Sequence, residues 1–147
     1  MFKEVLIVCI GNICRSPVAE HLLRHALAQP SIRVSSAGLA ARAGHPIDRL
    51  ALATLERRGH HGISHSARQV TPEMVNAADL VLVMERGHLQ GVLRRVPLAR
   101  GKTFLMGRWD GNYDIPDPYR KEMPAFEHAY ALIEKSVAAW SQRICFG

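Results

Sequence analysis

The strongest constraint on the fold is an apolar run, Val5 to Ile10, that leads into a cysteine-containing turn and then into a helix start. A continuous apolar run of this length is typical of a central parallel strand that is covered on both faces. After the turn, Pro17 suits the first position of a helix, Ser16 can cap it, and apolar residues recur at helical spacing as far as Leu27. The sequence therefore predicts a strand, a tight loop and a helix in immediate succession.

The rest of the chain repeats this alternation of short β-branched runs with helical periodicity. We expect further strands over residues 32–36, 80–84 and 103–106, a helix over 47–55, a short helical turn from residue 71 and a long closing helix over 126–144. This order predicts an α/β fold, a small doubly wound parallel sheet of about four strands with helices on both faces. Ligands bind such sheets beyond the carboxyl ends of the strands, which points to the loop after the first strand.

The length and composition fit a single domain over residues 1–147. A chain of 147 residues, 48% of them hydrophobic, can bury a core without metals or disulfides. Its longest apolar runs are far short of the ~20 residues that a spanning helix needs, and no signal-peptide layout is visible at the amino terminus. Three cysteines, an odd number, make a poor disulfide framework for a secreted protein. We therefore expect a cytoplasmic protein with no membrane insertion, present as a monomer or weak oligomer.

The excess of basic residues raises the question of nucleic acid. The net charge is +6, but the basic pairs, such as Arg57-Arg58, Arg94-Arg95 and Arg120-Lys121, are spread along the chain without a long run or interleaved aromatic residues. No nucleic-acid partner is therefore predicted. Attraction of an anionic substrate is an alternative use of this charge.

The loop after the first strand combines a nucleophile with an anion cradle. Five residues separate Cys9 from Arg15, and a loop of this size can turn its backbone N–H groups toward one tetrahedral anion, with the helix N-terminus adding positive charge. Arg15 can offer two parallel hydrogen bonds to phosphate oxygens. The same field favours the thiolate form of Cys9, and Ser16 is placed to hydrogen-bond its sulfur. The predicted phosphate-binding residues of this loop are Ile10, Gly11, Asn12, Ile13, Cys14 and Ser16.

Cys14 is the second specific feature of this loop. It lies five positions after Cys9 in the same turn. Its ordinary role is core packing, whereas its functional role would be to capture oxidised Cys9 as a reversible disulfide. Both interpretations stay open at this point.

Four segments together carry a resemblance to a known family. They are Cys9-Ile10-Gly11-Asn12-Ile13-Cys14-Arg15-Ser16-Pro17, Ser35-Ser36-Ala37-Gly38, Ser64-His65-Ser66-Ala67-Arg68-Gln69 and Ile115-Pro116-Asp117-Pro118-Tyr119-Arg120. In this order the chain resembles the low-molecular-weight protein tyrosine phosphatases nearly end to end. Trp109-Asp110 ahead of the last segment is most similar to Gram-negative enzymes that are encoded with exopolysaccharide or capsule machinery. The resemblance implies a phosphotyrosine protein as substrate, specifically a membrane-bound tyrosine autokinase with a tyrosine-rich tail.

The same resemblance implies two-step chemistry without metal or cofactor. Cys9 attacks phosphorus to form a phosphocysteine, and an acid protonates the leaving phenolate. Asp117 is the matching family position for that acid, and the prolines on either side of it stiffen its loop. Asp114 and Asp110 are the alternatives.

Supporting roles also follow from the resemblance. It implies that Asn12, Ser36 and His65 form a hydrogen-bond network that holds the phosphate loop in shape, and their side chains suit that role. Leu39 and Tyr119 are expected at the pocket mouth. Eukaryotic members carry an aromatic residue after the second strand and a second tyrosine after Asp-Pro-Tyr. Leu39 and Arg120 occupy those places here, so the pocket wall is less aromatic.

Particular residues, present or missing, argue against each competing function. Zinc binding by His60, His61 and His65 is disfavoured because companions at ligand spacing are missing. Arsenate reductases of this fold need two further cysteines in the middle of the chain, which is free of cysteine between Arg15 and Ile144. Protein arginine phosphatases carry threonine in place of Ile13. A noncatalytic phosphotyrosine-binding module would keep Arg15 but has no need of a cysteine and an aspartate together.

Overall fold

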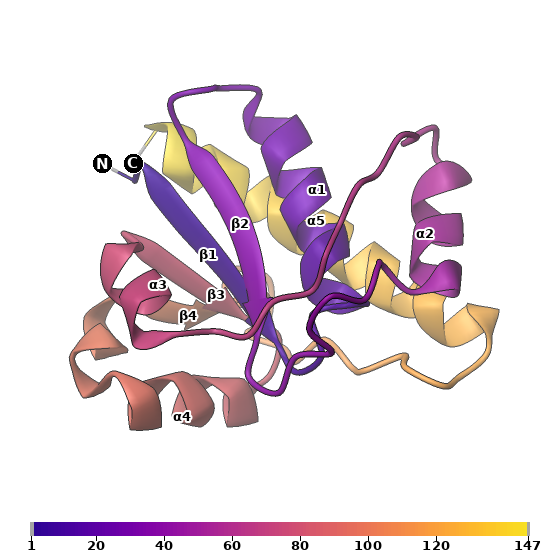
Figure 1. Cartoon of the computed structure of the whole chain (residues 1–147). Helices are drawn as coiled ribbons and strands as arrows, with labels where there is room; N and C mark the ends of the chain where they lie inside the picture. The colour runs from indigo at the N-terminus through magenta and orange to yellow at the C-terminus, as the bar shows by residue number, and fades with distance from the viewer. Residues whose placement is uncertain (1, 147) are drawn as a thin grey trace.

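Four parallel strands form the sheet at the centre of the chain, in the order β2-β1-β3-β4 (Figure 1). The structure is a computed structural model that describes residues 2–146. The strands are β1 (Glu4–Cys9), β2 (Arg33–Gly38), β3 (Leu80–Val83) and β4 (Thr103–Leu105). The helices are α1 (Arg15–Leu27), α2 (Arg49–Glu56), α3 (Pro72–Ala77), α4 (Arg86–Arg95), the 3-10 helix η1 (Pro97–Lys102) and α5 (Met123–Phe146). The predicted doubly wound α/β sheet is confirmed.

The side chains of β1 alternate between two cores, which explains its continuous apolar sequence. Ile7 and Cys9 belong to the core under α1 and α5, whereas Leu6 and Val8 belong to the core under α3 and α4. Figure 1 shows these helix pairs on opposite sides of the sheet. β1 pairs with β2 on one edge and with β3 on the other. After β2 the chain therefore crosses over β1 and adds β3 and β4 on the opposite side, so the direction in which strands are added reverses at β1. The carboxyl end of β1 is therefore the position where this fold class binds ligands.

The closing helix α5 carries the apolar stripe that the sequence predicted. Every residue of that stripe is buried: Phe126, Tyr130, Ile133, Val137, Trp140 and Ile144. Trp140 also donates its indole N–H to the carbonyl oxygen of Met106, 2.9 Å away, which anchors the helix beyond β4. Within residues 2–146, no helix is long and apolar enough to cross a membrane.

The start of α1 differs from the sequence prediction. The helix begins at Arg15 rather than Pro17, and its N-cap residue is Cys14, which makes no side-chain cap hydrogen bond. The Ser16 hydroxyl lies 2.9 Å from the Cys9 sulfur, so this serine is not the cap. Helix α4, which was not predicted, is short and contains two glycines, Gly87 and Gly91, that weaken a helical pattern.

Three histidines, His21 and His25 of α1 and His60 of the segment after α2, lie in contact with one another. His21 Nε2 lies 3.1 Å from His60 Nδ1, and the His25 ring centroid is 5.2 Å from that of His60. Burial and the neighbouring imidazoles lower the pKa of His21 and of His60 below the ordinary 6.5. The unfolded chain therefore binds more protons than the folded chain just below pH 6.5, and folding stability falls as pH falls through that value.

We therefore expect the melting temperature of the protein to fall between pH 7.5 and pH 5.5 by a larger amount than that of a His21→Gln, His60→Gln variant. Because both side chains are partly exposed, the difference should be on the order of 2 °C. Thermal unfolding across this pH range measures it. Identical pH profiles for the two proteins would contradict the assignment.

Candidate active site

The Cys9 thiol lies at the bottom of a pocket at the carboxyl end of β1. Its side chain is buried, and the sulfur is 2.9 Å from the Ser16 hydroxyl. The pocket has a volume of about 200 Å³. Its walls are formed by Cys9, Ile10, Gly11, Ile13, Cys14, Arg15, Ala40, Arg42, Asp117 and Tyr119. Most of the loop residues predicted from the sequence thus line one cavity, together with an aspartate and a tyrosine from a segment a hundred residues further along.

Asn12 holds the loop in its curved shape from behind. It has a left-handed backbone conformation (φ 59°) and is fully buried. Its side-chain amide donates to the hydroxyls of Ser16 (2.8 Å) and Ser36 (2.9 Å), while its backbone carbonyl lies 2.6 Å from His65 Nε2. Asn12 thus does not face the pocket. It joins Ser36 and His65 in one hydrogen-bond network behind the loop.

Two further members of this network were not assigned a role from the sequence. Glu20 of α1 accepts a hydrogen bond from the Ser36 hydroxyl at 2.6 Å, and the backbone N–H of Arg68 donates to Asn12 Oδ1 at 2.9 Å. Gly38 closes the same region by close approach, because a Cβ there would collide with the carbonyl oxygen of Ile10. The loop is thus supported by β2, α1 and the segment before α3.

Arg15 lines the pocket, is buried, and is fixed by two acceptors that lie outside the pocket lining. Its Nη1 donates to Glu85 Oε2 at 2.5 Å and to the Ile115 carbonyl oxygen at 2.8 Å. Its Nη2 lies 3.6 Å from Asp117 Oδ2. Among residues 2–146 these are the partners of the guanidinium, so Nε–H and Nη2 remain for a ligand. A planar fork held in this way suits two oxygens of one phosphate.

Glu85 is a site residue that the sequence did not reveal, and His88 orients it. The Glu85 backbone N–H donates to His88 Nδ1 at 3.3 Å, and His88 Nε2 lies 3.5 Å from Glu85 Oε2. Burial and the Arg15 cation lower the pKa of His88, so its imidazole is neutral at pH 7. With Nδ1 accepting, the proton sits on Nε2 and faces the carboxylate. The histidine therefore steadies the group that holds Arg15.

Asp117 is the one of the three candidate acids that lies in the pocket. Its Oδ2 faces Arg15, its Oδ1 accepts the backbone N–H of Tyr119 at 3.0 Å, and its side chain is 46% exposed. The alternatives are engaged elsewhere. Asp114 accepts from Arg86 at 3.0 Å, and Asp110 is 2.8 Å from the ammonium group of Lys135. The carboxyl of Asp117 can thus meet a ligand that Arg15 also binds.

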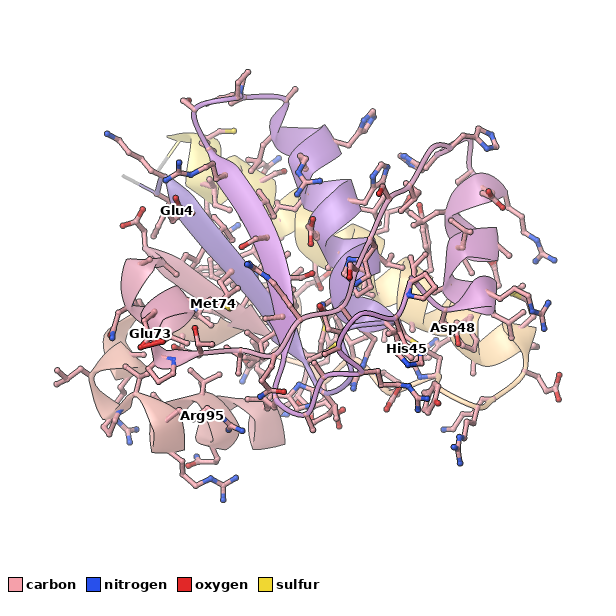
Figure 2. All side chains as sticks on the ribbon, viewed as in Figure 1. Glu4, His45, Asp48, Glu73, Met74 and Arg95 are labelled. Carbon is pink, nitrogen blue, oxygen red and sulfur yellow. The ribbon has the colours of Figure 1, made fainter. Side chains whose placement is uncertain are left out.

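The pocket mouth differs from the prediction at Leu39. Its side chain packs on α4, where a Cβ on Gly91 would lie 2.8 Å from Leu39 Cδ1. Arg95, labelled in Figure 2, donates to the Leu39 carbonyl oxygen at 3.0 Å and draws this segment toward α4. Leu39 therefore does not line the pocket. Ala40 and Arg42 line it instead, together with Tyr119.

A buried cysteine thiol, an arginine fork and an aspartate in one small pocket are the arrangement expected of a phosphate-transfer enzyme. Residues 4–145 match the family described as low molecular weight phosphotyrosine protein phosphatase. The chain belongs to this family.

Individual phosphatases and a related enzyme agree with the assignment. The chain is 46% identical over 144 residues to the probable low molecular weight protein-tyrosine-phosphatase EpsP of Ralstonia solanacearum, covering 98% of this chain and 97% of that relative. The structure of Vibrio vulnificus Wzb in complex with benzylphosphonate superimposes with a TM-score of 0.92 at 41% identity, covering 97% of this chain and 99% of that one. The YwlE arginine phosphatase from Geobacillus stearothermophilus matches with a TM-score of 0.90 at 30% identity, covering 97% and 93%.

The histidines of this phosphatase have roles other than a shared metal site. His65 supports the loop, whereas His60 contacts His21, so the two do not converge. Across residues 2–146, no group of three or more His, Cys, Asp or Glu side chains is arranged to hold a metal ion.

Cys14 is buried and lines the same pocket as Cys9, and both thiols are free. Burial, reinforced by the nearby carboxylates of Asp48 and Asp117, raises the pKa of Cys14 far above its ordinary value. Cys14 is therefore a neutral thiol at pH 7. In the phosphatase, this leaves Cys9 as the thiol of the pair that peroxide should oxidise first.

We expect mild peroxide to inactivate the phosphatase reversibly, because a sulfenic acid on Cys9 can condense with the Cys14 thiol to form a disulfide and release water. A reductant should restore most of the activity of the native chain. In the Cys14→Ser variant the reductant should restore only a small part of the activity that the same variant had before peroxide. Mass spectrometry of the oxidised protein checks the pairing, and Cys9 linked only to Cys145 would contradict it.

Proposed function

We propose that this phosphatase hydrolyses phosphotyrosine in proteins by covalent catalysis at Cys9. The Cys9 sulfur attacks phosphorus, the bond from phosphorus to the tyrosine oxygen breaks, and Asp117 gives its proton to the leaving phenolate. Asp117 then takes a proton from water, the water oxygen attacks the phosphocysteine, and Cys9 leaves as a thiolate. Phosphate is released, and the enzyme returns to its starting protonation state.

The observation that carries this proposal is the sharing of one pocket by Cys9, Arg15 and Asp117. Arg15 lies between the loop and the acid, with Nη2 3.6 Å from the Asp117 carboxylate. A phosphate in the loop would place its leaving oxygen toward that carboxylate. A noncatalytic binding module would need the arginine and the loop but gains nothing from a thiol and an acid on either side of the phosphate.

Each residue of the loop then has a role in the reaction. The backbone N–H groups from Ile10 to Arg15 stabilise charge on the phosphate oxygens, and Ser16 hydrogen-bonds the sulfur as attacking and leaving group. The Asn12 network holds these donors ready before the substrate arrives, so little reorganisation is needed in the transition state. No cofactor is needed in this scheme.

The proposed substrate is a membrane tyrosine autokinase of exopolysaccharide production, dephosphorylated in the cytoplasm. The similarity to EpsP and the Trp109-Asp110 segment support this context. A pull-down with Cys9→Ser from the native lysate tests it, because this variant should retain a phosphorylated substrate. A double variant that also carries Arg15→Ala is the control, since it should lose the phosphate contacts as well. The expected result is a tyrosine-phosphorylated autokinase that the control does not retain.

Tyrosine rather than arginine specificity is supported by the apolar wall of the pocket. Ile13 is buried and lines the pocket, and Ile10 is 41% exposed at its edge. These side chains and Tyr119 suit a flat phenyl ring. The benzylphosphonate bound to the Vibrio vulnificus relative has such an aryl group. A guanidinium would leave N–H groups unpaired against Ile13, at a cost of roughly 1–3 kcal/mol each.

We therefore expect kcat/KM to be at least about tenfold higher for a phosphotyrosine peptide than for a matched phosphoarginine peptide. Phosphoserine should be poorer still, because its shorter side chain holds the phosphate out of reach of Cys9. Ile13→Thr should bring the kcat/KM values of the two peptides closer together, because the threonine hydroxyl can accept a hydrogen bond from the guanidinium. Phosphoarginine turnover equal to phosphotyrosine turnover in the native enzyme would favour the arginine phosphatase function instead.

A further inference from the structure

Two arginines meet over Tyr119 at the mouth of the pocket. Arg42, from the segment between β2 and α2, lines the pocket and donates from Nη1 to the Tyr119 hydroxyl at 2.8 Å. Its guanidinium carbon lies 5.8 Å from the centre of the Tyr119 ring. The guanidinium carbon of Arg120 lies 5.4 Å from the same ring centre. Two exposed cations from distant parts of the sequence are thus held beside one aromatic ring.

Neither cation is neutralised by the protein. In the part of the chain from residue 2 to 146, no carboxylate forms an ion pair with Arg42 or Arg120. The nearby acids are engaged elsewhere. Asp117 faces Arg15, and Asp48, labelled in Figure 2, accepts the backbone N–H groups of Leu50 and Ala51 at the start of α2.

We propose that Arg42 and Arg120 form a second anion site, which selects phosphotyrosine segments that carry another negatively charged side chain beside the reacting residue. This inference rests on the proposed phosphotyrosine phosphatase function. The second anion can be a carboxylate or the phosphate of a neighbouring phosphotyrosine, since a guanidinium binds either group through paired N–H donors.

The two arginines are placed where they can contact an anionic side chain next to the reacting phosphotyrosine. Tyr119 is both a wall of the pocket and the platform for both guanidinium groups, so the second site adjoins the ring of a bound phosphotyrosine. An extended peptide advances about 3.3 Å per residue, so a side chain one or two positions away can reach the pocket mouth. The reacting phosphate would then be held by Arg15 while its neighbour is held outside.

The expected preference is moderate and depends on salt, because both arginines are exposed. Exposed ion pairs contribute little individually, and their attraction is screened as the Debye length falls from about 10 Å at 0.1 M salt to about 3 Å at 1 M. We expect a peptide with an anionic neighbour to exceed its neutral counterpart in kcat/KM by about 3-fold to 10-fold at low salt. At 1 M salt the two peptides should be nearly equal.

Three matched peptides test the proposal. Each carries one phosphotyrosine, and the adjacent positions hold glutamine, glutamate or phosphonomethylphenylalanine, whose phosphonate carbon prevents hydrolysis. A gain only with glutamate identifies the second anion as a carboxylate, and a gain only with the phosphonate identifies it as a second phosphotyrosine. A gain with both identifies a general anion site. Equal kcat/KM for all three peptides in the native enzyme at low salt would overturn the proposal.

Enzyme variants assign the preference to these two residues. Arg42→Gln and Arg120→Gln should each reduce the ratio of anionic to neutral peptide, and the double variant should bring it close to one. Tyr119→Phe, which removes the hydrogen bond from Arg42 but neither charge, should keep the ratio. Arg94→Gln on α4 removes one positive charge, as each single variant does, but away from the pocket. It should also keep the ratio of anionic to neutral peptide. A preference that survives in the double variant would overturn the proposal.

The outcome for the glutamine peptide separates this proposal from the function on which it rests. If the native enzyme hydrolyses that peptide without preferring its anionic counterparts, the second anion site is wrong and the phosphatase function stands. If it hydrolyses none of the three peptides, the proposed function itself is wrong.

Discussion

Replacing Cys9 with serine is expected to reduce phosphotyrosine turnover by roughly 10³-fold to 10⁶-fold while inorganic phosphate still binds. The serine oxygen occupies a similar position beside the Ser16 hydroxyl, but it is a far weaker nucleophile at neutral pH than a thiolate. The loop N–H groups and Arg15 are unchanged, so the anion site remains. Steady-state assays with p-nitrophenyl phosphate and calorimetric titration with phosphate measure the two effects separately.

Arg15→Lys is the matched comparison for this variant. A lysine keeps the charge but cannot donate to Glu85 and the Ile115 carbonyl while also presenting two parallel N–H groups to the phosphate. Both phosphate affinity and turnover should therefore fall, the rate by roughly 10²-fold to 10³-fold. Substantial turnover in purified Cys9→Ser, or unchanged phosphate affinity in Arg15→Lys, would contradict the assigned roles.

Sequence patterns predicted the elements whose signals are local. The apolar run of β1 and the alternating four-residue and three-residue spacing of α5 reflect burial within a short stretch of sequence. The turn before α1 is likewise visible in consecutive residues. Helix α4 lacks such a signal, because Gly87 and Gly91 interrupt it. Gly91 is needed for a contact that only the fold creates, the close packing of Leu39 on the helix. The same contact explains why the prediction for Leu39 was wrong.

The site was predictable where its residues are consecutive and unpredictable where they are brought together by the sheet. Cys9 and Arg15 share one turn, and their spacing alone indicates an anion cradle. Glu85 follows β3 and looks like any solvated carboxylate in the sequence, yet the strand order places it beside Arg15. Glu20 is similar, because its contact with Ser36 depends on α1 packing along β2. Long-range polar contacts of this kind leave no periodic pattern.

Replacing Asp117 with asparagine tests whether this carboxyl acts as the acid. Its carboxyl contacts Arg15 and the Tyr119 backbone, so replacing it with asparagine keeps the size and much of the hydrogen bonding of the side chain. What asparagine cannot do is release a proton to a leaving group. Asp117→Asn should therefore slow phosphotyrosine hydrolysis by about 10²-fold to 10⁴-fold.

The loss should depend on the leaving group, which separates acid catalysis from a structural effect. A tyrosine phenolate has a pKa near 10 and needs the proton, whereas a nitrophenolate of low pKa departs without one. A series of aryl phosphates should therefore show a steeper dependence of rate on leaving-group pKa in Asp117→Asn than in the native enzyme. Asp114→Asn is the matched control, because that carboxylate is engaged by Arg86 and lies outside the pocket lining. An equal loss across the whole series would mean that Asp117 only shapes the pocket, and the proton would then have to come from another donor.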